Sequence, residues 1–140
     1  MRRILLMFFI FLIFSFYANG QTLHLYGGSG HDVYLGCLNC DSYENSSIWN
    51  EYGTYGSSYN SNSIWNEYGT YGSEYGTYSP WNEHSNTPPV VVDKDGNFYG
   101  YFTINEYKSK RADSELALII YEYYELIRKD VGKWYGKIFE

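Results

Sequence analysis

The chain has 140 residues, of which 44% are hydrophobic, and its formal net charge is -6. Between residues 21 and 107, ten acidic side chains stand against a single basic one, Lys94. Such a surface repels polyanions, so nucleic-acid binding, which depends on Lys and Arg neutralising phosphates, is excluded as an expected function. Aromatic residues make up 21% of the chain, including 18 tyrosines and four tryptophans. Since aliphatic residues are scarce before the last thirty, we expect a core built largely from Tyr and Trp.

Residues 1–20 have the pattern of a cleavable signal peptide. Two arginines precede an apolar run at residues 4–14, which is shorter than the ~20 residues that a membrane span requires. The small residues Ala18 and Gly20 suit a signal peptidase and predict cleavage before Gln21. An uncleaved N-terminal anchor is the alternative. We expect a protein that is secreted, periplasmic or on the cell surface, without a stable membrane span after cleavage.

The remainder, residues 21–140, is long enough for one modest core and predicts a small single domain of the α+β class. A first β-hairpin is expected within residues 21–46, with a Gly-Gly-Ser-Gly turn. A second is expected within residues 89–107, where Asp95-Gly96 is a strong hairpin signal.

Residues 47–88, between the hairpins, form an array of 16-residue repeats. The segment Ser-Ile-Trp-Asn-Glu-Tyr-Gly-Thr-Tyr-Gly-Ser at 47–57 recurs unchanged at 63–73, and a degenerate third copy begins at Ser79. One unit cannot bury its apolar face alone, so the units are expected to pack on one another. Within a unit, we expect the serine to cap a single helical turn and the glycine after tyrosine to end it in the left-handed conformation.

The tryptophan and asparagine of each unit are candidates for ligand binding. One interpretation places these side chains in the core, where Trp is usually buried. In the other, aromatic faces stack on sugar rings, Asn bonds to hydroxyls, and the periodic array matches a periodic ligand. The candidates are Trp49, Asn50, Trp65, Asn66, Trp81 and Asn82.

The two predicted hairpins resemble each other. Residues 33–43 align with residues 97–107, matching Gly36 with Gly100 and Tyr43 with Tyr107. The offset is 64 residues, four times the repeat period, which suggests growth by duplication of one unit.

A helix is the last expected element, at residues 113–131. Asp113 or Ser114 is the expected cap, and Gly132 is expected to stop the helix. Apolar residues fall at steps of three and four along it, so one face is expected to cover the sheet.

The combination of a Leu-Gly-x-Leu hairpin, Ser-Ile-x-Asn-x-Tyr-Gly-x-Tyr-Gly-Ser units and a second Gly-containing hairpin resembles a group of uncharacterised bacterial proteins with tandem Tyr-Gly-Ser repeats. The resemblance extends from about Leu23 to Tyr107. It implies a bacterial origin and a repeat architecture, and it implies no activity and no functional residue. Proline often stands in that group where this chain has glutamate in Asn-Glu-Tyr, which makes this chain more acidic.

Cys37 and Cys40, the only cysteines, predict a structural disulfide or none in an exported protein. Neither cysteine nor histidine spacing matches a zinc pattern. Residues 93–97 resemble the start of a calcium loop, but Phe98 and Ile104 stand where that loop needs glycine and glutamate. We therefore expect no metal and no cofactor.

These features predict an exported, non-enzymatic binding or structural module for a glycan or protein at the cell exterior. Duplication of eleven unchanged residues favours it, because a catalytic site rarely needs the same residues twice. The alternative is a small secreted hydrolase or thiol-redox protein that uses Cys37, His31 and Asp32. The ligand and the oligomeric state stay open.

Overall fold

A computed structural model describes residues 20–140. The signal peptide predicted at residues 1–20 therefore lies, apart from its last residue, outside the described residues. The elements are β1 (His24–Gly27), β2 (Val33–Cys37), β3 (Val90–Val92), β4 (Phe98–Tyr101), α2 (Glu115–Ile127) and α3 (Val131–Phe139). The α+β class is confirmed, and each predicted hairpin range contains an antiparallel strand pair.

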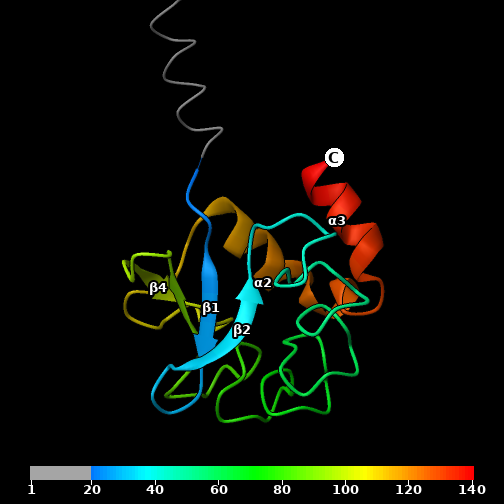
Figure 1. Ribbon diagram of the computed structural model, residues 1–140. Helices are drawn as coiled ribbons and strands as arrows, with labels where there is room; N and C mark the ends of the chain where they lie inside the picture. The colour runs from blue at the N-terminus through cyan, green and yellow to red at the C-terminus, as the bar shows by residue number, and fades with distance from the viewer. Residues whose placement is uncertain (1–19) are drawn as a thin grey trace, which may run out of the picture.

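One sheet contains both hairpins, in the order β2-β1-β3-β4. The two hairpins join through antiparallel pairing of β1 with β3, in which His24 faces Val92 and Tyr26 faces Val90. The repeat array therefore connects β2, an edge strand of the sheet, to β3, an inner strand. Figure 1 shows the array as green coils beside the blue and olive strands.

The likeness between residues 33–43 and 97–107 extends to three dimensions. Gly36 and Gly100 both have positive φ, 116° and 125°, which glycine adopts without strain. The residue after each glycine forms an isolated parallel bridge with a later segment, Cys37 with Ser47 and Tyr101 with Arg111. Two structurally equivalent segments thus flank the array.

The C-terminal region contains two helices where one was predicted. Helix α2 begins after Ser114, whose hydroxyl accepts a hydrogen bond from the Ala117 amide. The expectation that Gly132 stops the helix was wrong. The Asp130 side chain accepts from the Lys133 amide and starts α3, with Gly132 in its first turn.

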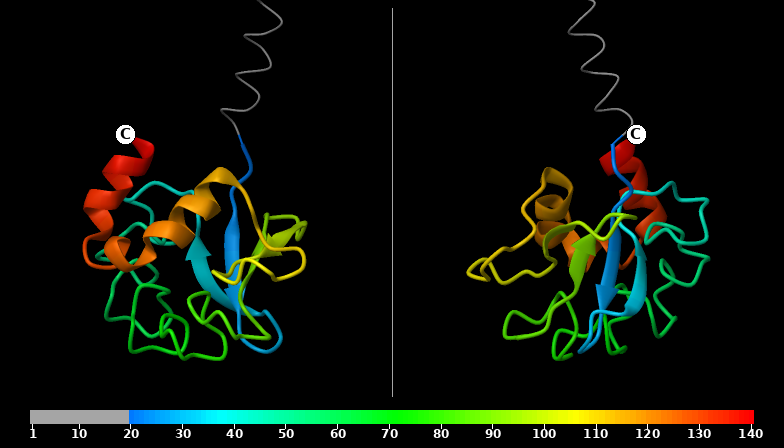
Figure 2. Two further views of the ribbon diagram at one scale, coloured as in Figure 1. Left: turned by 180° about the vertical axis from the view of Figure 1, so that it is seen from behind. Right: turned by 60° about the vertical axis from the view of Figure 1, so that its left-hand side comes forward.

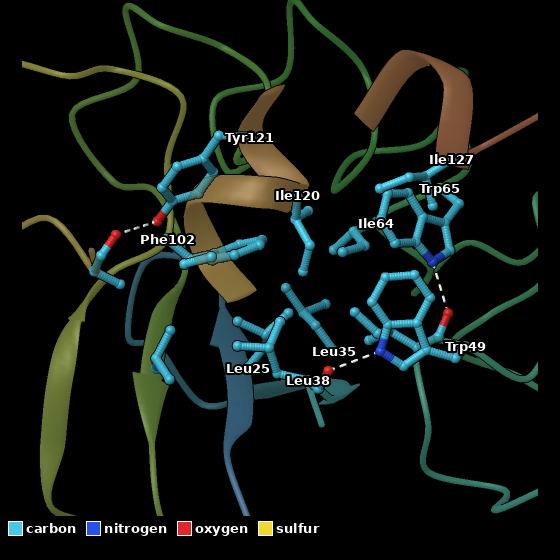
Figure 3. Packing of buried hydrophobic residues seen from close by; sticks show 14 of the residues in the cluster. Leu25, Leu35, Leu38, Trp49, Ile64, Trp65, Phe102, Ile120, Tyr121 and Ile127 are labelled. Carbon is cyan, nitrogen blue, oxygen red and sulfur yellow. Dashed lines mark hydrogen bonds between the residues drawn. The ribbon is translucent and has the colours of Figure 1, made fainter. Parts of the chain in front are cut away.

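The helices close a core that is shared by the sheet and the repeats (Figure 2). Tyr124 of α2 stacks on Trp81 with ring centroids 4.4 Å apart, and Phe139 of α3 meets Trp49 edge-on at 5.5 Å. Figure 3 shows Leu25 and Leu35 of the sheet facing the same interior as Ile120 of α2. Among residues 20–140, no helix has the length and apolar character to cross a membrane.

Candidate functional site: the tyrosine face of the repeats

Each repeat unit is a succession of tight turns. The Ser47 hydroxyl accepts from the Trp49 amide, and the Asn50 carboxamide oxygen accepts from the Tyr52 amide. The helical turn expected after serine was wrong, because these side chains bond the amide two residues on and stabilise Ser and Asn turns instead of a helix. Ser57 and Asn60 make the same bonds to the amides of Tyr59 and Asn62, so such turns recur along the array.

The repeat glycines serve close packing. They are absent from the glycines with positive φ in the described chain, so the predicted left-handed conformation was wrong. A Cβ atom at Gly56 or Gly72 would lie 2.0 or 2.1 Å from the carbonyl oxygen of Asn50 or Asn66. Only glycine lets the chain pass this close to the asparagine backbone.

The tryptophans form a ladder inside the molecule. Trp49, Trp65 and Trp81 are at most 1% exposed. Their indole N–H groups donate to carbonyl oxygens of the preceding coil, those of Leu38, Ile48 and Ile64, at 2.8, 2.6 and 2.6 Å. Figure 3 shows the bonds of Trp49 and Trp65. The buried rings leave no face for a ligand to stack on, so the structure corrects the candidate binding role of these tryptophans and supports the core interpretation.

The two equivalent hairpin segments close the ladder at its ends. Leu38, just after β2, supplies the first carbonyl, to Trp49. At the other end, Pro80 occupies the position of Ile48 and Ile64 in the third unit, but no fourth tryptophan follows to bond its carbonyl. That carbonyl accepts a hydrogen bond from the Ile104 amide, after β4, at 2.9 Å. The hairpins therefore act as the capping units that a repeat array requires.

The candidate asparagines are also used internally. The amide nitrogens of Asn50, Asn66 and Asn82 donate to backbone carbonyls six residues earlier at 3.2, 3.1 and 2.9 Å. Their carboxamide oxygens accept from amides two residues later. Both ends of each side chain are thus used in turn formation, and of the three asparagines Asn66 also lines a surface hollow.

The large hydrophobic side chains that the repeats present to solvent are tyrosines. Tyr52, Tyr59, Tyr68 and Tyr75 are 92, 93, 90 and 90% exposed. The amide of each donates to an Asn or Ser side chain two residues earlier, which holds the backbone while the ring projects. The sequence analysis did not predict that the tryptophans would be buried and these tyrosines exposed. The spacing of Tyr two residues after Asn or Ser is the signal that indicates it.

Three hollows alternate with these four tyrosines along the array. One of about 220 Å³ lies between Tyr52 and Tyr59, one of about 470 Å³ between Tyr59 and Tyr68, and one of about 390 Å³ between Tyr68 and Tyr75. Arg128 lines all three. We call this surface, defined by the four tyrosines and Arg128, the tyrosine groove.

Arg128, just after α2, is the polar centre of the tyrosine groove. Its Nη2 lies 3.4 Å from a Glu67 carboxylate oxygen and 3.6 Å from one of Glu74, and its side chain is 15% exposed. The Tyr124 hydroxyl donates to the Glu74 carboxylate at 3.3 Å. Burial, reinforced by the nearby glutamates, raises the pKa of Tyr124, which keeps this hydroxyl a donor. A cation and two carboxylates are thus held in fixed positions at the surface.

The cysteine neighbourhood contains no assembled active site. Cys37 and Cys40 are joined in a disulfide, so the possible disulfide is confirmed. Cys37 is fully buried and lies at the end of β2, whereas His31 and Asp32 precede that strand. His31 Nε2 lies 3.0 Å from the Pro88 carbonyl oxygen. No thiol is free to act as a nucleophile in the described chain.

The acidic turn at residues 93–97 is a hairpin turn. The Asp93 carboxylate accepts from the Asp95 and Asn97 amides, the Asn97 side chain and the Tyr99 hydroxyl. These bonds, that of the Asn97 side chain foremost, lower the pKa of Asp93. Within residues 20–140, no group of three His, Cys, Asp or Glu side chains could hold a metal ion.

Comparison of the chain with protein-family models, with curated proteins and with solved structures finds no match.

Proposed function

We propose that this protein is an exported, non-enzymatic binding module that uses its tyrosine groove to contact a glycan or a protein at the cell exterior. The observation that carries the proposal is the set of four tyrosines, each at least 90% exposed, on turns whose backbone is fixed by side-chain hydrogen bonds.

Packing does not account for these tyrosines. The fold needs the buried Trp of each unit, the buried Ile of the first two, the serines and asparagines of the turns, and the glycines at the close approaches. A ring that is nine-tenths exposed contributes almost no burial, so a purely structural role would be met equally well by serine at these positions.

Tyrosine is well suited to recognition. It is enriched at binding interfaces because its large amphipathic ring has only two side-chain torsions to restrict on binding. Repetition adds to this, because several weak contacts on one rigid array bind a repeating ligand more tightly than any single contact does.

The binding proposal is tested by replacing the four groove tyrosines together. The variant Tyr52→Ser, Tyr59→Ser, Tyr68→Ser, Tyr75→Ser should lose binding of the labelled protein to intact bacterial cells and isolated cell walls. The matched control is Tyr43→Ser with Tyr107→Ser, because these residues are 85 and 88% exposed and lie outside the groove. The control should bind like the wild type. Equal binding by the two variants, or no binding by the wild type, would contradict the proposal.

Export is tested separately, by expressing residues 1–140 in a bacterium and sequencing the N-terminus of the fractionated protein. The expected product starts at Gln21 in the periplasm or medium. A cytoplasmic product that retains residues 1–20 would contradict export without bearing on the groove.

A further inference from the structure

We infer that the tyrosine groove is built for a neutral, linear glycan that lies across Glu67, Arg128 and Glu74. This inference rests on the proposed binding function and names its ligand class.

The shape of the groove favours an extended ligand. Its three hollows follow one another along the array, each bounded by two successive tyrosines and each lined by Arg128. A chain of sugar rings laid along the groove would meet an aromatic side chain at every hollow, whereas a single small molecule would use one hollow only.

The charges of the groove favour a neutral ligand. The groove is lined by two basic side chains, Arg128 and Lys129, and by four acidic ones, Glu51, Glu67, Glu74 and Asp130, so both signs are present with an excess of carboxylates. The excess of carboxylates repels a polyanion, and Arg128, which lines all three hollows and lies beside Glu67 and Glu74, repels a polycation at the centre of the groove. A hydroxyl group both donates and accepts, and it therefore suits carboxylates and a guanidinium at the same time.

Arg128 has donor capacity left over. Its Nη2 is committed to Glu67 and Glu74, but its buried Nη1 has no hydrogen-bond partner among the described residues. An orphaned donor on a charged group is costly, and a ligand oxygen admitted by a small shift of the side chain would satisfy it.

The lining also disfavours an apolar peptide as the ligand. Apart from Gly56 and Val131, the hollows are bounded by aromatic, polar and charged residues. The buried centre of a protein interface is normally depleted of such charged groups. The surface thus combines aromatic faces with hydrogen-bonding groups of both kinds, as recognition of a sugar chain requires.

The third repeat unit shows where the groove ends. Glu51, Glu67 and Glu83 are equivalent by sequence, but Glu83 lies 3.4 Å from His84 and lines none of the three hollows. His84 stands where the first two units have Tyr52 and Tyr68. The degenerate unit therefore supplies a natural control position.

Calorimetric titration of the mature protein, residues 21–140, tests the ligand class. The neutral probes are cellohexaose, mannohexaose and chitohexaose, and the charged probes are hexagalacturonate and hexalysine. At least one neutral hexasaccharide should bind about tenfold more tightly than either charged probe. Tighter binding of hexalysine or hexagalacturonate overturns the inference, and so does the failure of all three neutral probes.

Variants test the polar centre. Glu67→Gln and Arg128→Lys should each weaken hexasaccharide binding about tenfold or more, because they remove a charged acceptor and the planar guanidinium fork. Glu83→Gln should bind like the wild type. Thermal melting verifies that each variant is folded. If Arg128→Lys does not fold, Glu67→Gln alone tests the inference. Binding that survives both substitutions but is lost in the four-tyrosine variant would overturn this inference and leave the proposed function standing.

Discussion

The indole Nε1 of Trp65 donates a hydrogen bond to the carbonyl oxygen of Ile48, 2.6 Å away and 17 residues earlier. Trp81 and Ile64 repeat the same bond at the same distance and separation. A sequence repeat of 16 residues is thereby converted into a structural repeat, because each coil satisfies a buried carbonyl of the coil before it.

The ladder bond predicts a large cost for Trp65→Phe. The substitution leaves the Ile48 carbonyl without its buried donor and removes part of a ring that is 1% exposed. We expect the free energy of unfolding in urea to fall by about 2–4 kcal/mol. Trp134→Phe, at a half-buried position on α3, is the control and should cost about 1 kcal/mol or less. Equal losses in the two variants would argue against the ladder.

The close approach of chain segments predicts different outcomes for neighbouring glycines. Gly72→Ala would place Cβ 2.1 Å from the Asn66 backbone oxygen, whereas Gly69→Ala would place Cβ 3.1 Å from its nearest neighbour, the Asn66 side-chain nitrogen. We expect Gly72→Ala to cost more than about 3 kcal/mol or to prevent folding, and Gly69→Ala to cost about 1 kcal/mol. Thermal unfolding of the two purified variants measures the difference between their losses of stability. Equal losses would show that the glycines provide only local flexibility.

Loss of the disulfide should weaken the fold and leave it intact. A bridge between Cys37 and Cys40 closes a very short loop, for which loop-closure entropy gives about 2 kcal/mol. The equivalent segment after β4 has Tyr101 and Ile104 at the matching positions and keeps its shape without a bridge. The double variant Cys37→Ala, Cys40→Ala should therefore melt at a lower temperature with an unchanged circular dichroism spectrum. Complete unfolding at room temperature would contradict this expectation.

Stability should fall at alkaline pH because of Tyr121. Burial raises the pKa of Tyr121 to about 12, and its hydroxyl donates to the Ala112 carbonyl oxygen at 2.7 Å. The folded state thus favours the protonated phenol, so this stabilisation is complete below the unfolded pKa of about 10 and is lost as pH rises through about 12. A shift of this size corresponds to about 2–3 kcal/mol.

Melting temperatures measured from pH 8 to pH 12 check the Tyr121 prediction. Tyr121→Phe should be less stable than the wild type at neutral pH, because it leaves the Ala112 carbonyl unpaired. Its further loss between pH 10 and pH 12 should be smaller than that of the wild type. Parallel curves for the two proteins would show that Tyr121 does not cause the alkaline transition.

Local features were predictable because their signals are local. The repeat at residues 47–88, the two hairpins and the start of α2 are each specified by a few neighbouring residues. The second helix was missed, because the start of α3 depends on Asp130 as a cap, and Gly132 beside it is also a common stop signal.

The sequence by itself determined the repeat period and the α+β class, since these follow from spacing along the chain. It left open whether Cys37 and Cys40 are bridged, and the structure joins them. Tertiary structure alone decided which aromatic rings are buried. A tryptophan that reaches the carbonyl of the preceding coil is drawn into the core, whereas a tyrosine two residues beyond a side-chain-bonded turn is directed into solvent. It also placed Arg128, more than fifty residues beyond Glu67 and Glu74, between those two carboxylates. No sequence pattern predicts this contact, because it depends on how α2 packs against the repeat array.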